Sequence, residues 1–157
     1  MMLRIRTAEE ADVPVLAERR WDFRFEQDAA PPVVERTAFL EECRLFLREG
    51  LASGRWVCWV AEVDGRIVSN LSLQIVPKLP RPARPKDAWG YVSNVYTDPS
   101  HRGQGIGAEV LNAALRWAKE RDLELLILWP SPASRSFYER AGFKDENEIR
   151  ELSLRPE

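Results

Sequence analysis

The sequence has few residues of the types that bind metals or form disulfides. It contains one histidine, His101, and two cysteines, Cys43 and Cys58, in 157 residues. A single histidine excludes a histidine-rich metal site, and the Cys and His spacing of zinc modules is absent. Both cysteines lie in segments with apolar periodicity, which favours reduced core residues over a disulfide. We therefore expect a protein without a metal site.

Long hydrophobic runs and an excess of positive charge are also missing. No apolar stretch approaches the roughly 20 residues that cross a bilayer, and residues 1–6 lack the apolar segment of a signal peptide. The formal net charge is −2, whereas a general nucleic-acid-binding protein carries a strong basic excess. These absences predict a cytoplasmic protein that binds neither nucleic acid nor membrane.

Apolar residues are numerous enough for one folded domain. Hydrophobic residues make up 45% of the chain and aromatic residues 10%. A chain of this length suits one core rather than two. The expected domain spans residues 1–157.

Hydrophobic periodicity predicts an alternation of strands and helices. In the first half we expect a strand at 3–6, helices at 7–20 and 34–52, and strands at 56–61 and 66–76. The first helix has two possible starts, a capping box at residues 7–10 or the pair Asp12 and Pro14. Asp64-Gly65 predicts a tight hairpin turn between the two later strands.

The second half begins with residues 77–86, a proline-rich and basic segment that predicts a solvated loop. We then expect a strand at 89–97, a helix at 105–121, a strand at 125–129, a helix at 134–140 and at least one strand within 143–154. The order is β-α-α-β-β-β-α-β-α-β. It predicts an α/β fold with an antiparallel start and one βαβ unit.

The turn after the strand at 89–97 carries the strongest chemical signal. It reads Asp98-Pro99-Ser100-His101-Arg102-Gly103-Gln104-Gly105-Ile106-Gly107. The first backbone N–H groups of the following helix have no partner within it, and the helix dipole adds partial positive charge there. Three glycines let a phosphate approach the backbone closely. The turn therefore predicts an anion site, most naturally for a phosphate or pyrophosphate.

Two other nucleotide-binding motifs fit this turn poorly. Gly103-x-Gly105-x-x-Ala108 matches a loose dinucleotide fingerprint, but the next strand ends at Leu128-Trp129-Pro130 without the acidic residue that binds a ribose. About 50 residues follow the turn, too few for a doubly wound sheet. No Gly-Lys-Ser/Thr sequence is present, which excludes a Walker loop.

Two segments of the chain resemble a known family. Arg102-x-x-Gly105-x-Gly107 resembles the R/Q-x-x-G-x-G/A motif of the GNAT acetyltransferases, and Ser134-x-x-Phe137-Tyr138-x-x-x-Gly142-Phe143 is similar to a downstream segment of that family. The resemblance covers essentially the whole chain. It implies a mixed central sheet of about six to seven strands with a splayed fourth strand. It also implies acetyl-CoA as co-substrate and no metal.

The resemblance assigns roles to particular residues. The turn would hold the pyrophosphate of acetyl-CoA, and the main chain of the splayed strand would pair with the pantetheine arm. The residues so assigned are Val95, Tyr96, Thr97, Arg102, Gly103, Gln104, Gly105, Ile106 and Gly107. Tyr138 is the expected general acid for the coenzyme A thiolate. Ser134 is a further expected contact, although Ser131 and Ser134 stand where the family often has Asn and Ala.

The general base is less determined. Many family members place a glutamate on or before the fourth strand, and the segment 89–97 has none. Asp87, Tyr91 and a water held by Asn94 are the alternatives. His101 lies beside the phosphate turn, which favours a role in the loop over catalysis.

The segment Trp21-Asp22-Phe23-Arg24-Phe25-Glu26 is expected to connect the first two helices, where the family builds its acceptor site. Asp22 and Glu26 could receive a cationic amine there, or the aromatic residues could pack the helix pair with the charges in water. We therefore expect an N-acyltransferase acting on a primary amine of a small molecule or protein, as a monomer or homodimer. The alternative is a non-catalytic acyl-CoA-binding sensor or scaffold of the same fold.

Overall fold

The computed structural model describes residues 1–155, so Pro156 and Glu157 of the expected domain lie outside this range. Its strands are β1 (Leu3–Thr7), β2 (Trp56–Val63), β3 (Arg66–Pro77), β4 (Ala88–Thr97) and β5 (Leu126–Ile127). Its α-helices are α1 (Val13–Gln27), α2 (Arg36–Ser53), α3 (Ile106–Glu120) and α4 (Arg135–Arg140). Short 3-10 turns are η1 (Glu10–Asp12), η2 (Pro99–His101) and η3 (Pro132–Ser134).

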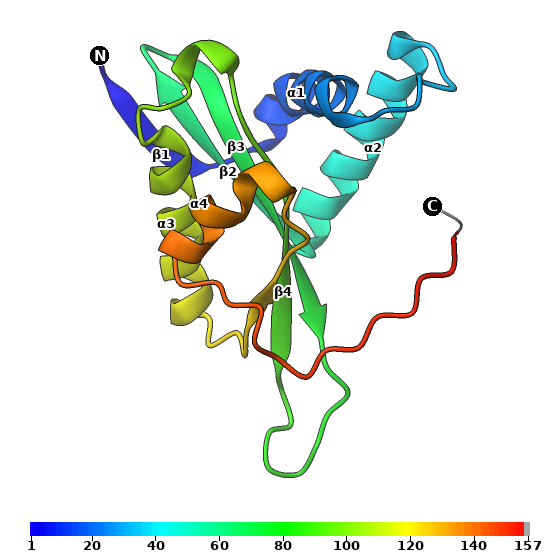
Figure 1. Ribbon diagram of the computed structural model, residues 1–157, viewed down its shortest axis with the longest axis vertical. Coiled ribbons are helices and arrows are strands. Elements are labelled where there is room, and N and C mark those ends of the chain that lie inside the picture. The colour runs from blue at the N-terminus through cyan, green and yellow to red at the C-terminus, as the bar shows by residue number, and fades with distance from the viewer. Residues whose placement is uncertain (156–157) are drawn as a thin grey trace.

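The strands form one sheet in the order β1-β2-β3-β4-β5. The first four are antiparallel, and β5 pairs parallel with β4 after the crossover helix α3. Helices α1 and α2 cover one face of the sheet, and α3 and α4 cover the other (Figure 1). Each face has its own buried core, with Leu16 and Val60 in one and Leu71 and Val110 in the other. The fold is the expected α/β arrangement with a mixed sheet.

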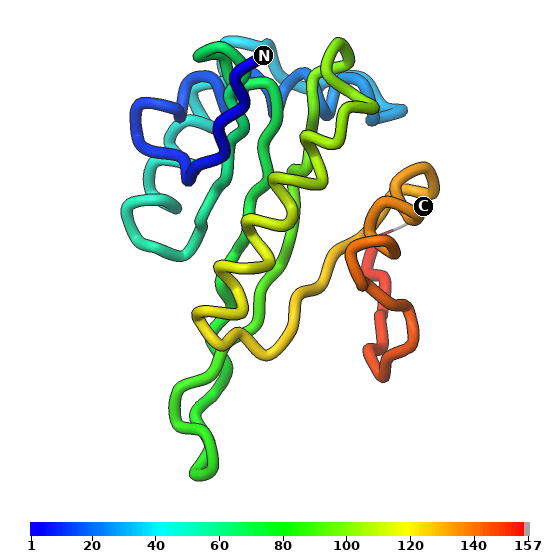
Figure 2. The backbone as a smooth tube through the Cα atoms, turned by 90° about the vertical axis from the view of Figure 1, so that its left-hand side faces the viewer, coloured from blue at the N-terminus to red at the C-terminus, as the bar shows by residue number. Residues whose placement is uncertain are grey.

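Strands β4 and β5 are paired over only two residues before they separate. Gly90 pairs with Leu126 and Tyr91 with Ile127. The chain then reaches Pro130, which has no N–H group to donate to a ladder. Figure 2 shows this segment running beside β4 after α3 and then away from it. Within residues 1–155, the part of β4 from 92 to 97 therefore has no strand partner on this side.

Asn94 and Val95 form a β-bulge in this part of β4. On the neighbouring strand β3, Asn70 faces Tyr96 and Ser72 faces Ser93. The two β4 residues Asn94 and Val95 therefore lie opposite the single β3 residue Leu71. Asn94 has φ 56°, in the left-handed region that asparagine tolerates better than most residues. The buried Asn70 side chain donates from Nδ2 to the Asn94 carbonyl at 2.7 Å. This bond satisfies a group that the bulge removes from the ladder.

The prediction of six to seven strands is wrong, because the described chain contains five. The expected strand within residues 143–154 is unpaired and largely exposed, and Leu152 and Leu154 are 82% and 87% exposed. Its alternating sequence has strand propensity. A strand, however, needs a neighbouring edge for its hydrogen bonds, and β5 is only two residues long.

The prediction that residues 21–26 connect two helices is also wrong. These residues continue α1, which ends at Gln27 rather than near residue 20. Trp21 packs on Phe39 of α2, with 5.5 Å between the ring centroids, and this contact holds the additional turns against α2. The connector is residues 28–35, and the expected acceptor segment is helical.

The predicted hairpin turn and one of the two predicted helix starts are located where the sequence places them, whereas the capping box is shifted. The β2–β3 hairpin turns at Asp64 and Gly65, whose φ values are 49° and 83°. Helix α1 begins after Asp12, the second of its two expected starts, and the capping box pairs Glu9 with Asp12 instead of occupying residues 7–10. Among the helices of residues 1–155, none is long and apolar enough to cross a bilayer.

Candidate active site

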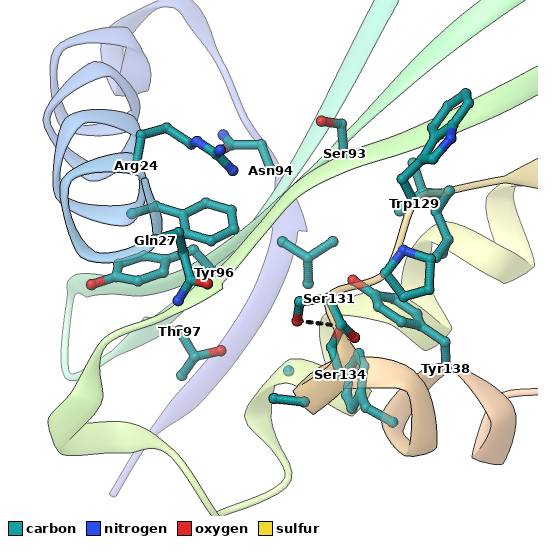
Figure 3. Close-up of a pocket in the computed structure, with 18 of the residues that line it drawn as sticks. Arg24, Gln27, Ser93, Asn94, Tyr96, Thr97, Trp129, Ser131, Ser134 and Tyr138 are labelled. Atoms are coloured by element: carbon teal, nitrogen blue, oxygen red, sulfur yellow. Dashed lines mark hydrogen bonds between the residues drawn. The ribbon is translucent and has the colours of Figure 1, made fainter. Parts of the chain in front are cut away.

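A cavity of about 690 Å³ opens where β4 and β5 separate (Figure 3). One wall is the unpaired part of β4, and the others come from α1, the start of α3 and the chain that leads into α4. The lining residues are Arg20, Phe23, Arg24, Glu26, Gln27, Tyr91, Val92, Ser93, Asn94, Val95, Tyr96, Thr97, Arg102, Gly107, Leu128, Trp129, Pro130, Ser131, Ala133, Ser134, Phe137 and Tyr138.

The Gly-rich turn adjoins this cavity and presents free backbone donors. Gly103 and Gly105 have φ 75° and 79°, left-handed values that glycine adopts without a steric penalty. Gly105 is the N-cap of α3, and its carbonyl accepts from the Glu109 amide at 3.1 Å. The amides of residues 106–108 precede that first bond and have no partner within the helix. Gly107 lines the cavity, where a Cβ atom would lie 3.4 Å from Thr97 Oγ1.

Arg102 in this turn is held by α1. Its Nη1 and Nη2 atoms donate to the two carboxylate oxygens of Glu26 at 3.0 and 3.1 Å, and its Nε donates to the Thr97 carbonyl at 2.9 Å. The Tyr96 hydroxyl donates to Glu26 at 3.2 Å. The hydrogen bonds from Arg102 hold the pKa of Glu26 below its ordinary value. The charge of Glu26 is thus neutralised inside this cluster.

Tyr138 reaches the cavity from α4. Its ring packs edge-on against Phe137 and Phe143, with centroids 5.0 and 5.7 Å away. Burial raises the pKa of Tyr138 to about 12, so the hydroxyl stays protonated at neutral pH. In Figure 3 this hydroxyl points into the cavity. It can therefore donate a hydrogen bond or a proton to a bound molecule.

Ser131 and Ser134 bond to each other just before α4. The Ser131 hydroxyl donates to Ser134 Oγ at 2.9 Å, and the Ser134 hydroxyl donates to the Ser131 carbonyl at 3.0 Å. Both residues line the cavity. Their mutual bonds close the turn η3 and so fix the direction in which α4 carries Tyr138.

The structure brings most of the sequence-predicted site residues to this cavity. Those in its lining are Glu26, Asn94, Val95, Tyr96, Thr97, Arg102, Gly107, Ser134 and Tyr138. Gly103, Gln104, Gly105 and Ile106 lie in the adjoining turn and helix start, outside the lining. Asp22 is exposed and does not line the cavity. With Glu26 bound to Arg102, the site does not support the expectation that Asp22 and Glu26 receive a cationic amine.

The alternatives for the general base separate in space. Tyr91 and Asn94 line the cavity, whereas Asp87 does not. Asp87 pairs with Lys78 at 3.3 Å and with Arg84 at 3.5 Å in the connection between β3 and β4. His101 also lies outside the lining, and its Nδ1 is 3.0 Å from Ser100 Oγ.

Sequence reasoning missed two arginines of the lining. Arg20 and Arg24 lie one helical turn apart on α1, and Gln27 continues the same face. The i, i+4, i+7 spacing is readable in the sequence. It indicates a shared face only if the helix extends to Gln27, and the expected connector at 21–26 concealed this.

The comparison with protein families identifies a match over most of the chain. The sequence model of the acetyltransferase (GNAT) family matches residues 14–143, a segment that includes every residue placed above in the cavity and the turn. A glucosamine 6-phosphate N-acetyltransferase from Trypanosoma brucei brucei is 36% identical over 90 residues, which are 57% of this chain and 59% of that relative. An uncharacterised N-acetyltransferase from Methanocaldococcus jannaschii is 31% identical over 62 residues, 38% of this chain and 27% of that relative. The chain thus spans less than two thirds of each of these relatives.

Solved structures share the fold over nearly the whole chain. A predicted acetyltransferase from Clostridium acetobutylicum, described with acetyl-CoA, has a TM-score of 0.81 and 27% identity, covering 98% of this chain and 97% of its own. A GCN5-related N-acetyltransferase from Ralstonia eutropha has a TM-score of 0.78 and 27% identity, covering 97% and 99%. The fold of the chain is therefore shared with acetyltransferases.

Proposed function

Because the chain belongs to the acetyltransferase (GNAT) family, we propose that it transfers an acetyl group from acetyl-CoA to the primary amine of a small molecule. The observation that carries this proposal is the meeting of three features around one cavity: the Gly-rich turn, the unpaired part of β4 and the Tyr138 hydroxyl. The Clostridium structure supports acetyl-CoA as the donor. The Trypanosoma relative is named for an amino sugar phosphate, which supports a small-molecule acceptor.

The donor is expected to bind along β4. The free amides of residues 106–108 donate to the pyrophosphate oxygens, and the partial positive charge at the start of α3 favours the anion. Main-chain groups of Val95, Tyr96 and Thr97 pair with the pantetheine arm as a further strand would. In this orientation the donor runs from the turn toward the bulge at Asn94, which places its thioester in the part of the cavity that Tyr138 faces.

The chemical step is a direct attack of a neutral amine on the thioester carbonyl. The C–N bond forms, the C–S bond breaks, and the proton lost by nitrogen ends on the sulfur of coenzyme A. Tyr138 passes a proton to the departing sulfur and recovers one from the nitrogen. An ordinary thiol has a pKa of about 8.5, below that of Tyr138, but the same burial that raises the tyrosine pKa also raises the proton affinity of a thiolate.

The amine must reach the thioester without its proton. The carboxylate in the lining, Glu26, is bound by Arg102, and no histidine lines the cavity described here. Arg20 and Arg24 place positive charge in the cavity, and a like charge lowers the pKa of an ammonium group. The acceptor therefore gives up its proton to water on entry, and Asn94 offers a polar group to hold that water.

Thiol release from acetyl-CoA with a panel of primary amines tests this proposal. An acetyltransferase releases one thiol for each N-acetylated product. A non-catalytic sensor binds acetyl-CoA in calorimetry but releases no thiol with any amine. The second result would overturn the proposed activity and favour the sensor.

A further inference from the structure

Arg20 is a charged side chain in the cavity wall without an acidic partner. Its guanidinium makes one side-chain hydrogen bond within residues 1–155, from Nη1 to Asn94 Oδ1 at 3.4 Å, and no ion pair. The residue is only partly exposed, and burial, followed by the like charge of Arg24, lowers its pKa. A guanidinium carries five N–H donors, and charges withdrawn from water are normally paired. Arg20 therefore has donors free for an anion.

Arg24 adds a second guanidinium to the same wall. It lies four residues after Arg20 on α1, and Figure 3 shows its side chain running from the helix toward Asn94. Arg24 forms an ion pair with Asp28, but Asp28 does not line the cavity and 45% of its side chain is exposed. Such exposed pairs contribute little and exchange readily with other partners.

The charges that face the cavity do not balance. Its lining contains three arginines and one glutamate, and the glutamate, Glu26, is bound to Arg102 beside the Gly-rich turn. Arg20 and Arg24 remain at the α1 wall together with the neutral side chain of Gln27, and the neutral side chain of Asn94 faces them from β4. Positive charge without an acidic residue repels a purely cationic amine and attracts an anion.

We propose that the acceptor carries an anionic oxygen group, phosphate or carboxylate, in addition to its amine, and that Arg20 and Arg24 bind this group. The inference rests on the proposed acetyl transfer and specifies its acceptor class. Arginine presents paired donors that match the oxygens of a carboxylate or phosphate. Anchoring the anion at α1 leaves the amine free to extend past Asn94 toward the thioester.

A matched series of amines tests the acceptor class. Ethanolamine, phosphoethanolamine and L-serine share a short amine scaffold and carry no acid, a phosphate and a carboxylate, respectively; glucosamine and glucosamine 6-phosphate form a larger pair. For at least one pair we expect kcat/KM to favour the anionic member by about tenfold or more, as a single charge-assisted contact provides. The two arms of the series distinguish phosphate from carboxylate.

Arg20→Gln and Arg24→Gln should remove that preference while the KM for acetyl-CoA stays within about twofold. Arg20→Lys keeps the charge but not the paired donors, so it should retain part of the preference for the anionic acceptor. The control is Arg116→Gln, because Arg116 is an exposed residue of α3 outside the lining. This variant should retain the full preference for the anionic acceptor. Neutral amines used as well as anionic ones, or a preference unchanged in Arg20→Gln, would overturn the inference.

A binding measurement keeps this inference separate from the proposed activity. Nuclear magnetic resonance of the arginine Nε–H groups, with coenzyme A present, reports whether inorganic phosphate reaches Arg20 and Arg24. We expect their signals to shift with phosphate and not with chloride at equal ionic strength. If no amine is acetylated but these signals shift, the proposed function fails and the anion site stands; if they do not shift, the anion site is refuted.

Discussion

At Tyr138 the ring and the hydroxyl have separate roles. The ring packs against Phe137 and Phe143, which fixes α4 on the sheet. The hydroxyl points into the cavity and is kept protonated by burial. A change that removes only the hydroxyl therefore tests chemistry without disturbing packing.

Tyr138→Phe should lower kcat by about 10²–10⁴-fold, the usual contribution of general acid–base catalysis. The KM for acetyl-CoA should change little, because the turn and β4 are the proposed binding site of the donor. Loss of an interaction made in the transition state lowers kcat and kcat/KM together. A kcat that remains within about threefold of the parent value would show that water or another group protonates the thiolate.

Substitutions at Gly105 can separate the effect of side-chain charge from the effect of side-chain shape in the Gly-rich turn. Asp and Asn have similar shapes and both tolerate the left-handed φ of 79° at this position. An aspartate at a helix N-terminus also favours the helix, so folding should persist. Gly105→Asp should bind acetyl-CoA about tenfold or more weakly than Gly105→Asn in calorimetry, a difference of about 1.4 kcal/mol. Equal affinities would mean that the phosphates bind elsewhere.

Glu26 should affect the donor rather than the acceptor, because its partner Arg102 belongs to the turn. Glu26→Gln should raise the KM for acetyl-CoA by no more than about fivefold, since partly exposed ion pairs are worth about 0–1 kcal/mol. Asp22→Asn, on the exposed side of the same helix, should change neither KM. Steady-state kinetics with both substrates varied decide this. A rise in the acceptor KM alone in Glu26→Gln would return this carboxylate to the acceptor site.

Among the elements, α1 joins the proposed acceptor side of the cavity to the proposed donor side. Near its middle, buried Arg19 forms an ion pair with Asp98 and donates to the Ile67 carbonyl, which ties the helix to the ends of β3 and β4. Arg20, the next residue, and Arg24, one turn further, face the cavity, and Glu26 holds Arg102. A single helix thus sets the position of both walls.

The start of α1 depends on a second group of charges. Arg6 of β1 donates to both carboxylate oxygens of Asp12 at 2.7 and 2.9 Å, and these hydrogen bonds hold the pKa of Asp12 below its ordinary value of 3.8. A lowered carboxylate pKa contributes stability above about pH 4, and this contribution disappears as the pH falls through the lowered value.

Asp12→Asn should therefore reduce the free energy of unfolding at pH 7 by about 2 kcal/mol. Below the lowered pKa of Asp12 the variant and the parent should converge, because the parent carboxyl is then protonated. Urea unfolding at neutral and strongly acidic pH gives both values, with Asp22→Asn as the control on the same helix. A difference that is constant with pH would refute a role for the Asp12 charge.

Elements that depend on the preferences of neighbouring residues could be predicted from the sequence. Elements that depend on a contact with a distant part of the chain could not. The hairpin at Asp64-Gly65 and the turn at Gly103 to Gly107 follow from backbone preferences of the residues themselves. The length of α1 depends instead on Trp21 meeting Phe39, and the absence of a strand at 143–154 depends on the lack of a neighbouring edge. The pair Arg20 and Arg24 was missed for the same reason, since these residues share a face only if α1 continues to Gln27.

In the whole molecule, the cavity exists because the sheet divides at its β4–β5 edge. Helix α3 and the turn lie on one side of this opening and α1 lies on the other. The chain that leads into α4 forms a further wall of the cavity. The split leaves the main chain of β4 unpaired, which is unfavourable for a sheet alone and favourable for one that receives an extended ligand. In the proposed reaction, the donor and the acceptor meet at the bulge around Asn94.

The most direct test of this account follows the acetyl group itself. With acetyl-CoA carrying carbon-13 at the carbonyl, nuclear magnetic resonance distinguishes thioester, amide and free acetate in one sample. We predict that the thioester signal converts to an amide signal on the amine acceptor at the rate of thiol release, and that Tyr138→Phe slows both equally. Conversion to acetate alone, or a thioester signal that persists with every amine, would contradict it.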